Sequence, residues 1–119
     1  MNKPFEITLE DERIKDVKPF IKEIKEIKRK PFNTVSGYHI TFNNGYLLSI
    51  QFFVGNYCDW HYQDFWHEFD YQTSKTAEIA YWKTPNGELI EIDGDTVLGY
   101  QTFGQVLEWM KKISQMEST

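Results

Sequence analysis

The side chains best suited to chemistry gather in one stretch of the chain, residues 55–71. At short spacings it contains a thiol, two imidazoles and two carboxylates: Cys58, His61, His67, Glu68 and Asp70. Thiolate, imidazole and carboxylate groups are the ligands that zinc and related metals take from proteins. The Cys58-x2-His61 pair is a weak indication of such a site, because a structural zinc normally has four protein ligands. A metal-dependent hydrolase is therefore one alternative, while we expect neither a bound metal nor another cofactor.

The same residues also include a possible nucleophile and base. Cys58 would be the nucleophile, with His61 or His67 accepting its proton. A thiolate needs electropositive surroundings, however, and the neighbouring Asp59 and Asp64 are negative. The chain contains no phosphate-binding loop, no Gly-rich dinucleotide fingerprint and no zincin motif. We therefore expect a protein that is not an enzyme.

Aromatic residues dominate this stretch. Seven of its seventeen residues are aromatic, four are acidic, and none is Lys or Arg. Long connections in compact domains tend to be functional, but these rings could equally cover one end of a sheet. In the binding interpretation, aromatic side chains anchor a partner protein, as Trp and Tyr do at interface hot spots: Trp60, Tyr62, Phe65 and Trp66. Acidic side chains would then form a polar rim that selects a basic partner surface: Asp59, Asp64, Glu68 and Asp70.

Charge is distributed unevenly along the 119 residues, whose net charge is −5. Residues 1–30 carry nine basic and seven acidic side chains, a net charge of +2. Residues 31–119 carry four basic and eleven acidic side chains, a net charge of −7. Because phosphate backbones bind chiefly to Lys and Arg, this acidic body argues against direct binding to nucleic acid. A protein with a basic surface is the better partner, since opposite potentials steer association.

Length and composition predict one domain over residues 1–119. Within it we expect a basic strand and helix element (1–30), an α+β core (31–113) and a frayed tail (114–119). No apolar run is long enough to span a membrane, and the N-terminus lacks the apolar region of a secretory leader. The single Cys58 cannot form an intramolecular disulfide, which favours a reducing compartment, so we expect a cytoplasmic protein.

The N-terminal part of the chain predicts a short strand followed by a helix. Residues 5–9 alternate between apolar and polar side chains, as in a strand. After Asp16, a potential N-cap, apolar residues recur at three- and four-residue steps and would form one face of a helix that ends before Pro31: Val17, Phe20, Ile21, Ile24 and Ile27. Lys18, Lys22, Lys25 and Arg29 would then form a basic stripe along this helix.

Two β-hairpins are expected in the core. The first joins residues 38–42 to residues 46–54 through Asn43-Asn44-Gly45. A three-residue loop puts the large apolar residues on one face, so we predict that Ile40 pairs with Leu48, with Gly45 in a left-handed bulge. The second hairpin joins residues 76–84 to residues 88–92, pairing Trp82 with Ile90.

A short strand (96–100) and a C-terminal helix complete the predicted fold. The helix begins at a capping box of Thr102 and Gln105, and it buries a face of apolar residues: Phe103, Val106, Met110 and Ile113. Together these elements predict an α+β fold, an antiparallel sheet of four to five strands with an N-terminal and a C-terminal helix packed on it.

Three blocks of sequence, in order over residues 38–113, resemble small uncharacterised proteins of bacteriophages and prophages. They are Phe42-Asn43-Asn44-Gly45-Tyr46 continuing to Gly55-Asn56-Tyr57-Cys58-Asp59, then Ser74-Lys75-Thr76-Ala77-Glu78-Ile79-Ala80, and finally Gly94-Asp95-Thr96-Val97-Leu98-Gly99-Tyr100. The resemblance implies an accessory protein of a phage or mobile element in the cytoplasm of the bacterial host, and it transfers no functional residue. In this chain, the aromatic residues 60–71 and the lysine-rich N-terminal segment depart from the pattern.

By analogy with small acidic phage proteins, the leading hypothesis is an inhibitor that docks on a host antiviral defence protein, as anti-CRISPR proteins do. The alternative from a different class is a protein that sequesters a nucleotide signal. It would stack the base on Trp60 or Trp66 and bind the phosphates with Lys22, Lys25 or Arg29. A homodimer is also possible, through an edge strand such as residues 5–9 or through the exposed aromatic segment.

Overall fold

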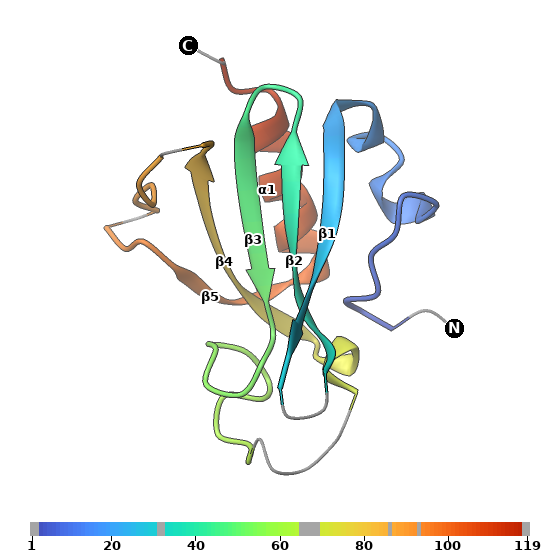
Figure 1. The fold of residues 1–119 in the computed structure, drawn as a ribbon, viewed down its shortest axis with the longest axis vertical. Helices are drawn as coiled ribbons and strands as arrows, with labels where there is room; N and C mark the ends of the chain where they lie inside the picture. The colour runs from blue at the N-terminus through green and yellow to red at the C-terminus, as the bar shows by residue number, and fades with distance from the viewer. Residues whose placement is uncertain (1–2, 31–32, 65–69, 86, 93, 118–119) are drawn as a thin grey trace.

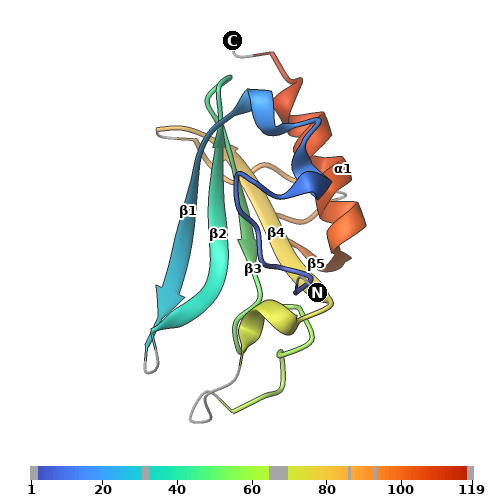
Figure 2. The same ribbon diagram turned by 90° about the vertical axis from the view of Figure 1, so that its right-hand side faces the viewer.

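The computed structural model describes residues 3–30, 33–64, 70–85, 87–92 and 94–117. A five-stranded antiparallel sheet has the order β1-β2-β3-β4-β5, and one α-helix, α1, packs against it. The strands are β1 (Ile21–Arg29), β2 (Thr34–Phe42), β3 (Tyr46–Gln51), β4 (Thr76–Lys83) and β5 (Leu98–Thr102). Figures 1 and 2 show α1 (Phe103–Ser114) and the N-terminal segment on the same face of the sheet. The predicted α+β class is confirmed.

The first hairpin has the predicted register. Ile40 lies opposite Leu48, and Tyr38 lies opposite Ile50. Gly45 has a φ of +91°, the left-handed conformation that a glycine adopts without strain. The hydrophobic pattern decides this register because a slip of one residue would turn every large apolar side chain of the strand to the other face.

The predicted N-terminal helix is wrong. Short 3-10 turns at Glu12–Ile14 and Lys18–Phe20 lead into β1, which pairs with β2. A shift in register between Ile21 and Glu23 inserts one extra residue, so Ile21 and Ile24 lie opposite Phe42 and Ile40 on the same face of the sheet. Because of the bulge, two apolar residues three positions apart lie on the same face of a strand, a spacing otherwise typical of a helix. Isoleucine is also β-branched, which favours a strand.

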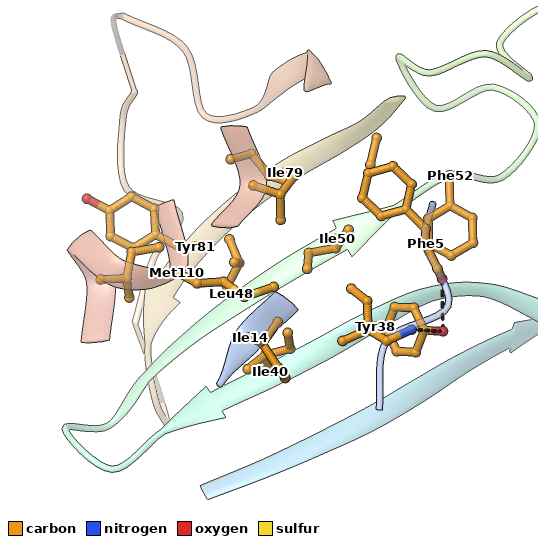
Figure 3. Close-up of a cluster of buried hydrophobic side chains, with 14 of the residues drawn as sticks. Phe5, Ile14, Tyr38, Ile40, Leu48, Ile50, Phe52, Ile79, Tyr81 and Met110 are labelled. Atoms are coloured by element: carbon orange, nitrogen blue, oxygen red, sulfur yellow. Dashed lines mark hydrogen bonds between the residues drawn. The ribbon is translucent and has the colours of Figure 1, made fainter. Parts of the chain in front are cut away.

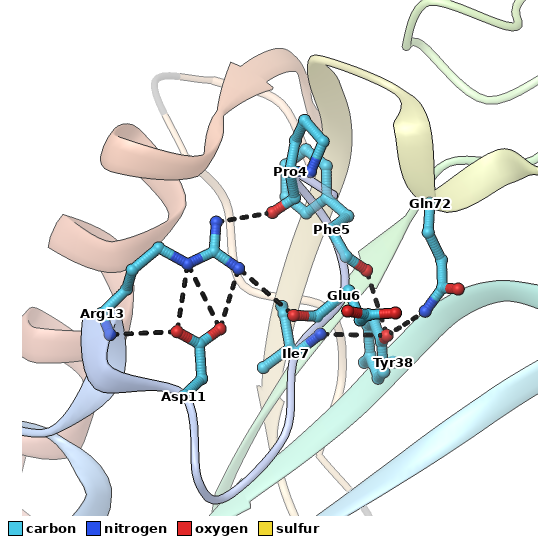
Figure 4. Close-up of polar contacts among 8 residues, drawn as sticks. All are labelled: Pro4, Phe5, Glu6, Ile7, Asp11, Arg13, Tyr38 and Gln72. Atoms are coloured by element: carbon cyan, nitrogen blue, oxygen red, sulfur yellow. Dashed lines mark hydrogen bonds and ion pairs between the residues drawn. The ribbon is translucent and has the colours of Figure 1, made fainter. Parts of the chain in front are cut away.

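Residues 5–9 do not form the expected strand, although Phe5 and Ile7 are buried as the alternation suggests. Two polar groups hold this segment in place (Figure 4). The hydroxyl of Tyr38 donates to the carbonyl oxygen of Phe5 (3.0 Å) and accepts from the N–H of Ile7 (3.1 Å). The guanidinium of Arg13 bonds the Asp11 carboxylate (2.8 Å) and donates to the carbonyl oxygens of Pro4 and Glu6.

The second predicted hairpin is also wrong. Residues 88–92 form no strand, and Ile90 makes one backbone hydrogen bond to β4, from its N–H to the carbonyl oxygen of Tyr81 (3.0 Å). The neighbouring part of this edge of β4 pairs instead with β5, where Thr76 lies opposite Thr102. The sequence pattern does not indicate which of these two segments pairs with β4, because both are short apolar runs that follow a turn.

Helix α1 begins and packs as predicted. Thr102 and Gln105 form the capping box, and Val106, Met110 and Ile113 are buried. Around the helix end at Ser114, the side-chain amide of Asn44 donates to the carbonyl oxygens of Ile113 (2.8 Å), within the last turn, and Met116 (2.9 Å), beyond it. The turn of the first hairpin therefore holds the chain at the start of the predicted frayed tail.

The core lies between the sheet and the layer formed by α1 and the N-terminal segment (Figure 3). Strands β2, β3 and β4 contribute its largest aliphatic side chains, including Ile40, Leu48, Ile50 and Ile79. Phe5 stacks on Phe52 with ring centroids 5.4 Å apart. Across the described residues, no helix is long and apolar enough to cross a membrane.

Candidate functional site

The aromatic stretch starts in a loop that follows β3 (green in Figure 1), and a carboxylate of β4 helps to fix this loop to the sheet. Glu78 of β4 accepts hydrogen bonds from the side-chain amide of Asn56 (3.1 Å) and from the N–H of Tyr57 (3.2 Å). Asn56 in turn accepts from the N–H of Phe53 (3.0 Å). The loop is therefore held against a strand rather than free in solution.

Asp59, one of the predicted rim residues, is engaged within the chain. Its two carboxylate oxygens accept hydrogen bonds from the N–H of Lys75 (2.8 Å) and the hydroxyl of Thr76 (2.5 Å). These bonds join the loop to the start of β4. Asp70 has a similar role, since it caps a 3-10 turn through the N–H of Gln72 (3.1 Å) and forms an ion pair with Lys3.

Trp60, one of the predicted anchors, is half-buried and packs against the core. Its indole N–H donates to the carbonyl oxygen of Tyr71 (3.0 Å), and the two rings meet edge to face with centroids 6.4 Å apart. Trp60 thus covers an end of the sheet, as the structural interpretation of the stretch expects. Of the other predicted residues, Phe65, Trp66, His67 and Glu68 lie outside the described part of the chain.

Among the described residues, four rings form a row, Tyr62, His61, Tyr57 and Tyr100, which we call the aromatic ladder. Tyr62 meets His61 edge to face (4.5 Å between centroids), and His61 stacks on Tyr57 (5.0 Å, 16° between planes). Tyr57 then contacts Tyr100 of β5 (6.3 Å). The three tyrosines are 92%, 47% and 51% exposed, in the order Tyr62, Tyr57, Tyr100.

The backbone around the ladder has an unusual geometry. Tyr100 has a φ of +55°, which non-glycine residues rarely adopt, and its N–H donates to the carbonyl oxygen of Tyr57 (2.8 Å). A Cβ atom at Gly99 would lie 2.5 Å from the Cβ of Tyr57, so only glycine fits there without a shift. Strained residues of this kind concentrate at functional sites, because the surrounding structure must hold them in place.

The segment that supplies three of the four ladder rings is acidic in sequence. No Lys or Arg occurs in residues 53–74, and Asp64 is exposed beside the described end of the loop. The pKa of Tyr100 is raised, first by desolvation and then by the neighbouring Tyr62, Cys58 and Tyr57 side chains. Tyr100 therefore stays neutral near neutral pH, and the formal charge of this surface comes from its carboxylates.

Cys58 is buried under the loop and is not set up as a nucleophile. Its thiol lies 3.5 Å from the carbonyl oxygen of Phe53, and burial, the largest cause, raises its pKa to about 11. A buried thiol with this pKa is protonated at neutral pH and unreactive.

The metal interpretation gains no support from the described residues. Nδ1 of His61 lies 3.0 Å from the carbonyl oxygen of Asn56, so Nδ1 carries the hydrogen and donates it. Within the described ranges, no three side chains of His, Cys, Asp or Glu come together as metal ligands do. The Cys58–His61 pair therefore has no third described ligand.

The three cations of the nucleotide hypothesis do not converge. Lys22 lines a hollow with Thr41 and Thr84, whereas Lys25 lies opposite His39. The guanidinium of Arg29 bonds the side chain of Gln51 (2.5 Å). Burial and then the charges of Lys25 and Arg29 lower the pKa of His39, so these two cations lie near one ring, while Lys22 lines a separate hollow. The three side chains are therefore not grouped around one phosphate.

Of the four ladder residues, sequence reasoning singled out only Tyr62 as a partner anchor. It considered His61 only as a metal ligand or base, and it passed over Tyr57 and Tyr100. They are far apart in the sequence, and the pattern gives no indication that β5 returns beside the loop. The chain matches no protein-family model, no curated protein and no solved structure in the comparisons with known proteins.

Proposed function

We propose that this protein is a non-enzymatic binding protein that docks on a partner protein through the aromatic ladder. The observation that carries the proposal is the ring-to-ring row of Tyr62, His61, Tyr57 and Tyr100, with all three tyrosines exposed. Tyrosine brings a large, rigid and partly apolar surface to an interface at little cost in conformational entropy. Tyr62 is 92% exposed, so nearly all of its ring is available for such a contact.

The acidic surroundings favour a partner with a basic surface. The carboxylate of Asp64 and the absence of Lys and Arg in residues 53–74 give this side of the molecule a negative potential. Such a potential steers a positively charged protein to the ladder and repels nucleic acid. The resemblance to phage proteins makes a host antiviral defence protein the class of partner that we propose.

A pull-down from lysate of bacteria that carry defence systems tests this function. The tagged protein is compared with Tyr62→Ala and with Leu89→Ala, a matched loss of an exposed apolar side chain outside the ladder. We expect one stoichiometric protein partner that Leu89→Ala retains and Tyr62→Ala loses. Retention of the partner by both variants would contradict docking through the ladder.

A thermal-shift screen with cyclic and linear nucleotides tests the sequestering alternative in parallel. A ligand that binds only the folded state raises the unfolding temperature, by an amount that grows with its concentration relative to Kd. We expect no shift, because Lys22 lies apart from Lys25 and Arg29, and Arg29 already bonds Gln51. A clear shift with one nucleotide would replace the docking proposal.

A further inference from the structure

Strand β1 lies at an open edge of the sheet, the first in the order β1-β2-β3-β4-β5. In the described part of the chain, the backbone groups of residues 22–28 make backbone hydrogen bonds only with β2. Their other edge is therefore unpaired, and in Figure 2 β1 ends the sheet on the side away from β5. An unpaired strand edge is a template for another strand.

The sequence of β1 is complementary to itself. Residues 21–27 have the sequence Ile-Lys-Glu-Ile-Lys-Glu-Ile. In the reversed sequence, Glu and Lys exchange places and Ile stays at the same three positions. If Ile24 lies opposite Ile24 of a second copy, Glu23 of each copy lies opposite Lys25 of the other. Lys22 is the extra residue of the bulge and is left out of this pairing. Opposite charges facing each other across an antiparallel pair stabilise it, and like charges destabilise it.

The faces of β1 permit only some registers. Lys25 and Glu23 point away from the core, as do their neighbours on β2, whereas Ile24 lies opposite the buried Ile40. Residues opposite each other in an antiparallel pair share a face of the sheet. A two-fold axis normal to the sheet must therefore place one residue of β1 opposite the same residue of the second copy. If the central pair is Glu23 with Glu23 or Lys25 with Lys25, two like charges face each other. If the central pair is Ile24 with Ile24, the facing charges have opposite sign.

The surface beside β1 can also take part in such a contact. A hollow of about 580 Å³ lies between β1 and the N-terminal segment, and its lining combines apolar side chains (Ile7, Leu9 and Ile24) with charged side chains of both segments. Leu9 is 43% exposed there. A second copy that extends the sheet at β1 would bring its own Ile24 to the same face as this hollow, where apolar surface remains to be covered.

We propose that the protein forms a homodimer in which the two β1 strands pair antiparallel about a two-fold axis at Ile24. The two sheets then form one continuous sheet, and the aromatic ladder of each copy lies on the β4–β5 side, away from the dimer contact. The contact is isologous, with each Lys25 facing the Glu23 of the other copy. The interaction uses a surface separate from the proposed partner site.

Sedimentation velocity tests the dimer, over concentrations from low micromolar to near-millimolar. The wild type is compared with Lys25→Glu and Glu23→Lys, both at exposed positions, and with the double variant that exchanges the two charges. The matched control is Lys15→Glu, which makes the same charge change at an exposed position outside β1. Far-UV circular dichroism confirms that each variant is folded.

The expected result is a wild-type dimer that Lys15→Glu retains. Each single variant in β1 places like charges opposite each other twice, so the dimer should weaken about tenfold or more. The double variant should recover the dimer. A mixture of the two single variants should recover it too, because positions 23 and 25 are then both acidic in one chain and both basic in the other. A wild type that is monomeric at every concentration, or a dimer that both single variants retain, would overturn the proposal.

Discussion

The N–H of Tyr100 donates a 2.8 Å hydrogen bond to the carbonyl oxygen of Tyr57, and this bond joins β5 to the loop that follows β3. The two tyrosine rings lie 6.3 Å apart as a result. The exposed aromatic surface is therefore built by tertiary structure, from two segments that are distant in the sequence. Its geometry depends on the residues that allow the two backbones to approach.

Gly99 is one such residue. A Cβ atom there would lie 2.5 Å from the Cβ of Tyr57, so we expect Gly99→Ala to push the loop away from β5. The free energy of unfolding should fall by about 1–3 kcal/mol, the usual cost of overpacking. Urea unfolding measures this change.

Gly104 provides the control for this prediction. A Cβ atom at Gly104 meets nothing closer than 3.9 Å, and alanine is the better helix former. Gly104→Ala should therefore leave stability unchanged or raise it slightly. Equal stability of Gly99→Ala and the wild type would show that the loop and β5 do not need their close approach.

Tyr38 holds the N-terminal segment on the core. Its hydroxyl bonds Phe5, Ile7 and the side chain of Gln72, so Tyr38→Phe leaves buried backbone groups without this partner. We expect a loss of about 1–3 kcal/mol in the free energy of unfolding, measured in urea. Tyr62→Phe, which removes a hydroxyl from a side chain that is 92% exposed, should change stability by less than about 0.5 kcal/mol. Equal effects of the two substitutions would contradict this role.

Asp11 makes stability depend on pH at the acid end. Burial alone would raise its pKa, but the hydrogen bonds and charge of Arg13 outweigh burial and hold the pKa below its usual value of 3.8. The Asp11 carboxylate therefore binds a proton more readily in the unfolded state than in the folded state. Its contribution to the free energy of unfolding is present above the usual pKa and is lost as the pH falls through the lowered pKa of the folded state.

Urea unfolding between about pH 2 and pH 5 measures this dependence. Asp11→Asn has no carboxyl to titrate, so its stability should fall less steeply with decreasing pH than that of the wild type. Parallel pH profiles for the two proteins would mean that Arg13 does not stabilise the Asp11 carboxylate. Asp16→Asn, at an exposed position, serves as the matched control.

Cys58 should be unreactive in the folded protein. Its thiol is buried and has a pKa of about 11, so a thiol reagent at mildly alkaline pH should label it slowly. The labelling rate should rise by orders of magnitude in denaturant, where the pKa returns to its ordinary value. Rapid labelling without denaturant would reopen the interpretation of Cys58 as a nucleophile.

The first hairpin and the C-terminal helix could be predicted from patterns among neighbouring residues. The register of the first hairpin follows from which face holds Tyr38, Ile40 and Phe42, and the helix from Thr102 follows from its capping box. In both cases local turn chemistry and burial favour the same structure, so no distant contact is needed to decide it.

Patterns that fit two structures misled the prediction. The three-residue spacing of Ile21, Ile24 and Ile27 suits a helix, but the unpaired edge of β2 and a bulge make the segment a strand. The choice depends on a contact with β2, which the spacing does not encode. The aromatic ladder could not be predicted for the same reason, since the contact between Tyr57 and Tyr100 depends on the pairing of β5 with β4.

The most direct test of docking through the aromatic ladder is a calorimetric titration of the purified partner with wild type, Tyr62→Ala and Leu89→Ala. If the ladder is a hot spot, Tyr62→Ala should weaken binding by about 2 kcal/mol, roughly thirtyfold in Kd, while Leu89→Ala binds like the wild type. An unchanged Kd for Tyr62→Ala, in a variant that unfolds like the wild type, would contradict the central claim.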